Sequence, residues 1–74
     1  MELDARGLSC PLPLLKARQA LATMAPGETL VVLATDPEAP IDLAALAADE
    51  GHEFAREQHA GVWRLTLVKA RPSR

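Results

Sequence analysis

The stretch PLPLLKARQALATMAPGETLVVLAT, Pro11 to Thr35, joins two apolar patterns through a stop signal. In the first part, apolar residues recur at steps of three and four, which predicts an amphipathic helix from Pro11 to Met24. Pro26 and Gly27 cannot extend that helix comfortably, so it must stop near Ala25. The unbroken aliphatic run that follows, Thr29 to Thr35, predicts a central strand covered on at least one face. The residues expected on the buried side of the helix are Leu14, Ala17, Leu21 and Met24.

The segments on either side of this stretch add one strand and one helix. Before it, Glu2 to Gly7 alternates apolar and polar residues, as a half-buried strand does. After it, a second helix is expected from near Asp36 or Pro40 to Glu50, with an irregular first turn, because a proline at a fourth helical position loses the first regular hydrogen bond. The face expected to be buried consists of Ile41, Ala44, Ala45 and Ala48.

The last part of the chain predicts two strands. His52 to His59 is a weak, polar strand candidate, Ala60 and Gly61 supply a turn, and Val62 to Lys69 alternates. Right-handed crossovers then place both helices on the same face of the sheet. We therefore predict an α/β fold, a two-layer sandwich of order βαβαββ, with a four-stranded mixed sheet whose open face carries polar residues. The expected side chains are Trp63, Leu65 and Leu67 on one side of the last strand, and Asp4, Arg64 and Thr66 on the open face.

Composition limits the class of protein. With 74 residues, 49% of them hydrophobic, the chain is long enough for one domain, which we assign to residues 1–70 with a frayed tail at 71–74. Acidic residues follow Met1 without a basic region or a long apolar run, so neither a secretion signal nor a membrane span is expected, and the chain is expected in the cytoplasm. The net charge of −2 argues against direct nucleic-acid binding. Residues 28–58 hold eight acids and one base, whereas 59–74 hold four bases and no acid, so the molecule should have unlike ends or faces.

The only cysteine lies in the sequence CPLP, Cys10 to Pro13, at the expected start of the first helix. One cysteine cannot form an internal disulfide, and with only His52 and His59 to help it makes a poor metal site, so no metal is expected. If Cys10 is the N-cap, Pro11 and Pro13 occupy the first and third helical positions, where a missing N–H costs little. The free helix donors and the helix dipole should then favour the thiolate, with Arg6 or Lys16 adding to the effect. Cys10 is therefore hypothesised to be a nucleophile.

The residues around Cys10 narrow its chemistry. Pro13 stands where a Cys-x-x-Cys protein carries its resolving thiol, so a dithiol redox cycle is disfavoured. A cysteine hydrolase needs a base beside the thiol, and His52 and His59 lie far along the chain. An exposed thiol can instead accept a group from another protein and hand it on, for which a persulfide is the natural cargo. The alternatives are a buried, inert Cys10, a non-catalytic binding or regulatory module, and a thiol redox or hydrolase enzyme.

The segments LDARGLSCPLPLLKARQAL, PGE and ATDPEAPIDLAALAADEGHE together resemble the TusA/SirA-like sulfur-carrier proteins, whose hallmark is a Cys-Pro-x-Pro motif, over Leu3 to about Lys69. The resemblance implies a βαβαββ sandwich like the C-terminal domain of bacterial translation initiation factor three. It also implies that Cys10 carries sulfur as a persulfide. Further recurrent family positions, with structural or partner-facing roles, fall on Gly7, Pro11, Pro13, Asp36, Pro37 and Asp42.

The resemblance also implies partners. A cysteine desulfurase with pyridoxal phosphate, or a rhodanese, would load the carrier, and a DsrE-type relay protein would unload it toward 2-thiouridine in tRNA, molybdenum cofactor or sulfur oxidation. The chain itself would be a stoichiometric carrier without cofactor, not an enzyme, and a monomer. Ser9 departs from the basic residue that many members carry before the cysteine. The donor, the acceptor and the choice of sulfur or selenium stay open. Candidates for a patch that docks an acidic or phosphate-bearing partner are Arg6, Lys16, Arg18 and Arg64.

Overall fold

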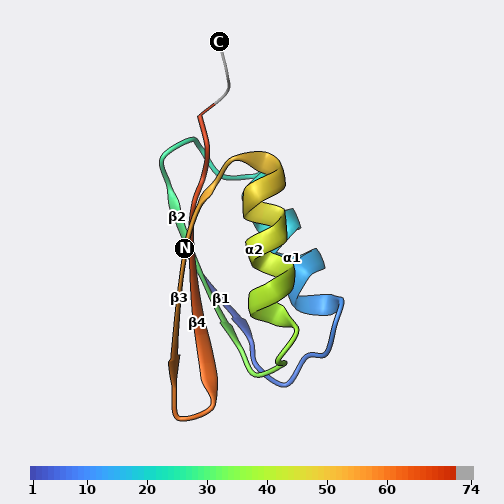
Figure 1. The fold of residues 1–74 in the computed structure, drawn as a ribbon. Coiled ribbons are helices and arrows are strands. Elements are labelled where there is room, and N and C mark those ends of the chain that lie inside the picture. The colour runs from blue at the N-terminus through green and yellow to red at the C-terminus, as the bar shows by residue number, and fades with distance from the viewer. Residues whose placement is uncertain (72–74) are drawn as a thin grey trace.

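Both helices cover the same face of one four-stranded sheet (Figure 1). The structure, a computed structural model, describes residues 1–71. This arrangement confirms the predicted two-layer α/β sandwich and the order βαβαββ. Its elements are β1 (Glu2–Ala5), α1 (Leu12–Ala22), β2 (Thr29–Ala34), α2 (Ala39–Glu50), β3 (Glu53–His59) and β4 (Val62–Val68).

The order of the strands places two loops at one edge of the sheet. The order is β1-β2-β4-β3, so β2 is a central strand, as its aliphatic run predicted. β1 pairs with β2 in parallel, with Ala5 opposite Ala34, while the β2–β4 and β3–β4 pairs are antiparallel. Because neighbouring parallel strands end at the same edge, the chain leaves β1 toward α1 close to where it leaves β2 toward α2.

The core lies between the sheet and the helices. Alternation along the strands fixes which side chains enter it: Ala5, Leu65 and Leu67 are buried, and Trp63 is half-buried against them, as predicted. The open face carries exposed Asp4 and Arg64 with half-buried Thr66, also as predicted. The other buried hydrophobic residues of the core are Ala17, Leu21, Met24, Leu30, Val32, Ala34, Ala39, Leu43, Leu46 and Ala47.

Helix α1 follows its predicted periodicity within slightly narrower bounds. Ala17, Leu21 and Met24 are buried and Leu14 is half-buried. The helix ends at Ala22, and the Lys69 ammonium donates a hydrogen bond to the Leu21 carbonyl oxygen there. A lysine at this end stabilises carbonyl groups that have no partner within the helix.

The predicted buried face of α2 is wrong. Ile41 is 59% exposed, Ala45 and Ala48 are exposed, and the helix instead buries Leu43 and Leu46. Two leucines three positions apart remove more apolar area from water than one isoleucine with alanines, and this difference in area sets the rotation of the helix.

The start of α2 also differs from expectation. The helix begins at Ala39, so Pro40 occupies its second position, where no intrahelical donor is needed and no regular hydrogen bond is lost. The irregular turn lies just before the helix instead, where Asp36 Oδ1 accepts a hydrogen bond from the Glu38 N–H at 2.9 Å.

The side chain of His52 is buried, although the sequence placed His52 in a polar strand candidate. Its side chain is only 4% exposed, and its Nδ1 accepts a hydrogen bond from the Ala70 N–H at 2.8 Å. Its Nε2 lies 3.0 Å from Glu50 Oε1. The ring thus ties the chain beyond β4 to the end of α2. His59, at the other end of that strand candidate, is exposed, and the predicted frayed tail, apart from Arg71, lies outside the described residues.

Candidate functional site

Cys10 is an exposed free thiol in the loop between β1 and α1. The first helical residue is Leu12 and the N-cap is Pro11, so Cys10 is not the N-cap that the sequence predicted. The Cys10–Pro11 peptide bond is cis. The Leu12 N–H, one of the helix donors expected to favour the thiolate, instead donates to the Ser9 carbonyl oxygen at 2.9 Å. The predicted exposure of Cys10 is confirmed, whereas its predicted place in the helix is wrong.

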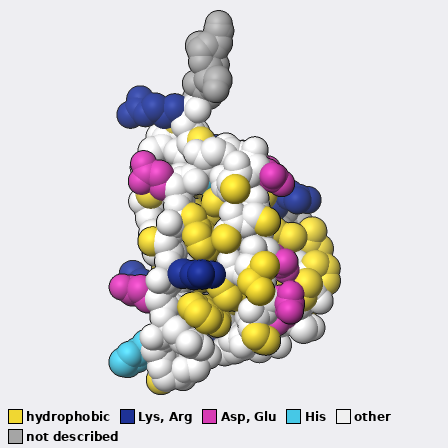
Figure 2. Space-filling model, viewed as in Figure 1, with side chains coloured by type: hydrophobic (Ala, Val, Ile, Leu, Met, Phe, Trp, Pro, Cys, Tyr) yellow, Lys and Arg dark blue, Asp and Glu magenta, His cyan; other side chains and the backbone are white. Residues whose placement is uncertain are grey.

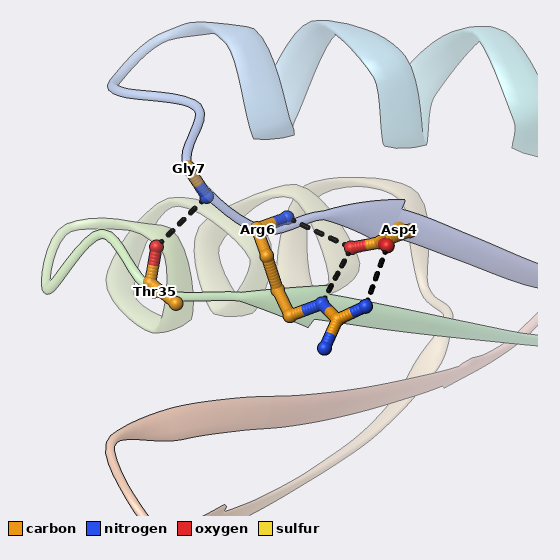
Figure 3. A network of polar contacts seen from close by, with 4 residues as sticks. All are labelled: Asp4, Arg6, Gly7 and Thr35. Atoms are coloured by element: carbon orange, nitrogen blue, oxygen red, sulfur yellow. Dashed lines mark hydrogen bonds and ion pairs between the residues drawn. The ribbon is translucent and has the colours of Figure 1, made fainter.

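Two hydrogen bonds fasten this loop to the end of β2. The Gly7 N–H donates to Thr35 Oγ1 at 3.0 Å (Figure 3), and the Cys10 N–H donates to Asp36 Oδ2. Gly7 has a φ of 81°, a conformation that a residue with a Cβ rarely adopts, although a Cβ there would meet no other atom within 4 Å. The requirement for glycine is therefore conformational, and the positioning role of Gly7 toward Cys10 stays a prediction.

The thiol itself contacts a carboxylate of the second helix. Cys10 Sγ donates to Asp42 Oδ2 at 3.2 Å, and Asp42 lies in the first turn of α2. This hydrogen bond is the largest cause that raises the pKa of Cys10 above its ordinary value. Partial desolvation and then the negative charges of Asp42, Asp36 and Glu38 raise it further. The predicted lowering of this pKa is therefore wrong: Cys10 lies outside the helix, and three nearby acids raise its pKa.

Arg6 does not supply the positive charge expected beside the thiol. Its guanidinium makes two bonds to Asp4, from Nε to Oδ1 at 2.9 Å and from Nη2 to Oδ2 at 2.8 Å (Figure 3). These two bonds, together with the hydrogen bond that the Arg6 backbone N–H donates to Asp4 Oδ1 at 3.1 Å, lower the pKa of Asp4 to about 2. Lys16, the other expected cation, is an exposed residue of α1. Within residues 1–71, the groups that shift the pKa of Cys10 include neither of them.

Exposed apolar side chains accompany the thiol. Leu12 is 44% exposed and Leu15 is 42% exposed, and they lie three positions apart, hence on one face of α1. Ile41, which precedes Asp42, is also exposed. Figure 2 shows hydrophobic and acidic side chains next to each other over the helix layer. Exposed apolar side chains that gather on one face suit contact with another protein, and the carboxylates beside them would favour a partner with positive charge.

Comparison with known proteins shows which family the chain belongs to. The family model for sulfurtransferase TusA matches residues 1–69. The chain belongs to the TusA family. It is 45% identical over 60 residues to the sulfur carrier protein TusA of Allochromatium vinosum, which covers 81% of this chain and 79% of the relative. It is 54% identical over 67 residues to a putative sulfur carrier protein of Neisseria meningitidis serogroup A, covering 88% and 89%.

A solved structure supports the TusA fold. The crystal structure of the SirA-like protein from Desulfitobacterium hafniense superimposes with a TM-score of 0.84 at 29% identity, covering 95% of this chain and 97% of that one. The resemblance seen in the sequence is thereby confirmed, and so is the fold that it implied.

Of the remaining residues predicted for this TusA-family site, Pro13 is fully buried and Pro11 is exposed, so only the first is held by the core. Arg18 lines a shallow hollow of about 170 Å³ between the helices, together with Asp42. Arg64 lies on the open face of the sheet, opposite Leu33 in register. The four proposed docking cations are thus not brought together at Cys10, and their role as a docking patch stays a prediction.

Asp36 and Asp42 are the partners of Cys10 that the sequence did not assign to it, although the TusA resemblance marked both as structural or partner-facing. Asp36 follows β2 as Cys10 follows β1, and parallel neighbouring strands end at one edge. The parallel pairing of the two strands could therefore have been used to predict that Asp36 lies near Cys10. No comparable signal pointed to Asp42, because its contact depends on the rotation of α2.

Other hollows formed by residues 1–71 are lined by residues other than Cys10 and its acidic neighbours Asp36, Glu38 and Asp42. One of about 420 Å³, at the far end of α1, is lined by Met24, Pro26, Glu50, His52 and Lys69 among others and contains no nucleophilic thiol. Residues 1–71 contain no cluster of three groups able to hold a metal ion. Among these residues, no helix has the length and apolar character needed to cross a membrane.

Proposed function

We propose that Cys10 is the sulfur-carrying residue of this chain, a sulfur carrier of the TusA family, and that it carries sulfur as a persulfide. The observation that supports this most directly is the exposed thiol at the edge of an apolar and acidic surface. The chain has one cysteine, so the same sulfur atom must both receive and release the cargo.

The transfer is a thiol–persulfide exchange. The Cys10 thiolate attacks the terminal sulfur of a donor persulfide, R–S–SH, and forms a new S–S bond. The S–S bond of the donor breaks, and its electron pair leaves with the donor sulfur, which takes up a proton. Overall, Cys10–SH and R–S–SH give Cys10–S–SH and R–SH, with no net oxidation. Unloading repeats this exchange with Cys10 as the donor, so one chain moves one sulfur atom per cycle.

The donor must be a protein that makes a persulfide, and a cysteine desulfurase or a rhodanese fits this chemistry. Pyridoxal phosphate would then act in the desulfurase, and the carrier needs no cofactor. A DsrE-type relay protein is the proposed acceptor, leading to tRNA 2-thiouridine, molybdenum cofactor or sulfur oxidation. A free thiol of this kind suits the reducing cytoplasm, where we place the carrier, as a monomer.

The test is to incubate the purified protein with a cysteine desulfurase and cysteine, then to record its intact mass before and after a reductant. Cys10→Ser removes the thiol, and Ser9→Ala is the matched control beside it. We expect a gain of one sulfur atom that the reductant reverses, present in the wild type and in Ser9→Ala and absent in Cys10→Ser. Circular dichroism should show that all three proteins are folded.

A different result would overturn the proposal. If neither a desulfurase nor a rhodanese adds sulfur while Cys10 still reacts with an alkylating reagent, the thiol is accessible but is not a sulfur carrier. A binding or regulatory module would then be the better description of the chain.

A further inference from the structure

We infer that Asp42 is a positioning residue that holds the unloaded Cys10 thiol in its protonated form until a positively charged donor surface docks. The inference rests on the proposed function and adds to it how the reactive sulfur is controlled. It concerns the free carrier, whose thiol would otherwise be open to any electrophile.

Two carboxylates hold Cys10, one through its backbone and the other through its side chain. Asp36 Oδ2 accepts the backbone N–H, and Asp42 Oδ2 accepts the hydrogen of Sγ at 3.2 Å. The first bond fixes where the backbone lies, and the second fixes where the side chain points. Both acceptors come from residues 36–42, so a single segment sets the position of the thiol.

The bond to Asp42 depends on the proton. An ionised carboxylate can only accept hydrogen bonds, so the contact requires that Sγ keep its hydrogen. A thiolate at the same place would set two negative atoms against each other. Carboxyl groups are much stronger acids than thiols, so the shared proton stays on sulfur. Asp42 is thus poorly suited to act as a general base and well suited to keep the thiol neutral.

The charges around the thiol act in the same direction. Asp36 and Glu38, from the connection between β2 and α2, and Asp42, from α2, all raise the pKa of Cys10. On the other side, Arg6 is bonded to Asp4 and Lys16 makes no contribution. A donor that places a lysine or arginine against these three acids would cancel the repulsion and favour the thiolate.

Loading also changes this contact. In Cys10–Sγ–SH, Sγ no longer carries a hydrogen, because the proton sits on the added sulfur. The hydrogen bond from Sγ to Asp42 cannot exist in the loaded carrier. The two states therefore present different surfaces at Asp42, which gives a donor and an acceptor a means to tell them apart.

The test measures how fast Cys10 reacts with iodoacetamide as a function of pH, in the wild type and in Asp42→Asn. Asparagine keeps the shape of the side chain, removes the charge and can donate to a thiolate. We expect the inflection of the profile to move to lower pH and the rate at neutral pH to rise about two- to fivefold, after allowing for the lower nucleophilicity of a more acidic thiol. Asp49→Asn, which removes an exposed charge two turns further along α2, should leave the profile unchanged.

A second reagent pair tests the charge of the partner. A cationic disulfide, cystamine, should exchange with wild-type Cys10 faster than an anionic one, dithiodiglycolate, and Asp42→Asn should reduce that ratio. Glu38→Gln removes a charge that does not touch the thiol, so it should act in the same direction but less, and it serves if Asp42→Asn does not fold. An equal ratio for the two disulfides in the wild type would contradict the inference.

Alkylation and sulfur loading separate the two proposals. If Asp42→Asn has the wild-type pH profile while the wild type still takes up sulfur on Cys10, the role of Asp42 is refuted and the carrier function stands. If Asp42→Asn shifts the profile but no donor loads the wild type, the carrier function fails and the control of the thiol stands.

Discussion

The Asp36 carboxylate joins Cys10 to the start of α2: Oδ2 accepts the Cys10 N–H, and Oδ1 accepts the Glu38 N–H at 2.9 Å. One side chain therefore fixes both the loop that carries the thiol and the turn that carries its acidic neighbours. Asp36 can do this because β1 and β2 are parallel neighbours, so the residues that follow each strand lie at the same edge. The distance between Cys10 and Asp42 therefore depends on the two hydrogen bonds that Asp36 accepts.

Asp36→Ala should lower the free energy of unfolding by about 1–2 kcal/mol, because two backbone donors lose their acceptor. Asp36→Asn, which keeps one oxygen, should cost less. Urea unfolding followed by circular dichroism measures both values, with the exposed Asp49→Ala as a control for the loss of one charge. Equal stability of Asp36→Ala and Asp49→Ala would show that the two hydrogen bonds to Asp36 do not stabilise the fold.

The rotation of α2 predicts a contrast between two neighbouring apolar residues. Leu43 is fully buried and Ile41 is 59% exposed. Leu43→Ala should cost about 2–5 kcal/mol, enough to leave a small domain barely folded, whereas Ile41→Ala should change stability by less than about 0.5 kcal/mol. Thermal and urea unfolding of both variants check this. The opposite order would restore the face that the sequence predicted.

The strands were predictable because alternation reports directly which side chains face the core. Ala5, Leu65 and Leu67 entered the core as the pattern required, and the aliphatic run Thr29–Ala34 became a central strand. The rotation of α2 was not predictable in the same way. Alanines lie on several sides of that helix, so spacing alone leaves more than one possible face, and the size of the leucines decides.

Only those parts of the site that lie close to Cys10 in the sequence were predictable. The motif placed the thiol, and Gly7 and Pro13 lie within three residues of it. The thiol donates its hydrogen bond to Asp42, which is separated from Cys10 by 32 positions in the sequence. Asp42 reaches the thiol only because of the way α2 packs on the sheet. The sequence suggested a lowered pKa for Cys10 because the start of α1 follows Cys10 directly in the chain, whereas the acids that contact or surround the thiol are distant in sequence. Charges from another segment reverse that direction.

The Asp4–Arg6 pair predicts a titration that can be followed directly. The pKa of Asp4 is about 2 in the folded protein, below the value of about 3.9 expected in the unfolded chain. The pair therefore adds stability above about pH 4, and this contribution is lost as the pH falls toward about 2. In Arg6→Gln, carboxyl NMR should show Asp4 titrating at a higher pH than in the wild type, but still below the unfolded value, because the backbone N–H of residue 6 still donates to Asp4 Oδ1. Because the pair is exposed, salt should weaken the difference, and an unchanged midpoint in Arg6→Gln would mean that Arg6 is not its cause.

The hairpin between β3 and β4 offers a stabilising substitution. His59 pairs with Val62, so the turn consists of Ala60 and Gly61, with φ values of 53° and 79°. Two consecutive positive φ values match a type I′ turn, which favours Asn-Gly, and an alanine at the first position is strained. Ala60→Asn should raise the free energy of unfolding by about 0.5–1 kcal/mol, while Gly61→Ala should lower it by a similar amount. The turn lies at the same end of the sheet as Cys10, but β2 separates its strands from β1, and it holds none of the groups that shift the pKa of Cys10. Neither change should therefore alter the rate at which Cys10 reacts with iodoacetamide. Urea unfolding measures the first effect and alkylation the second; a less stable Ala60→Asn would show that the alanine in this turn is not strained.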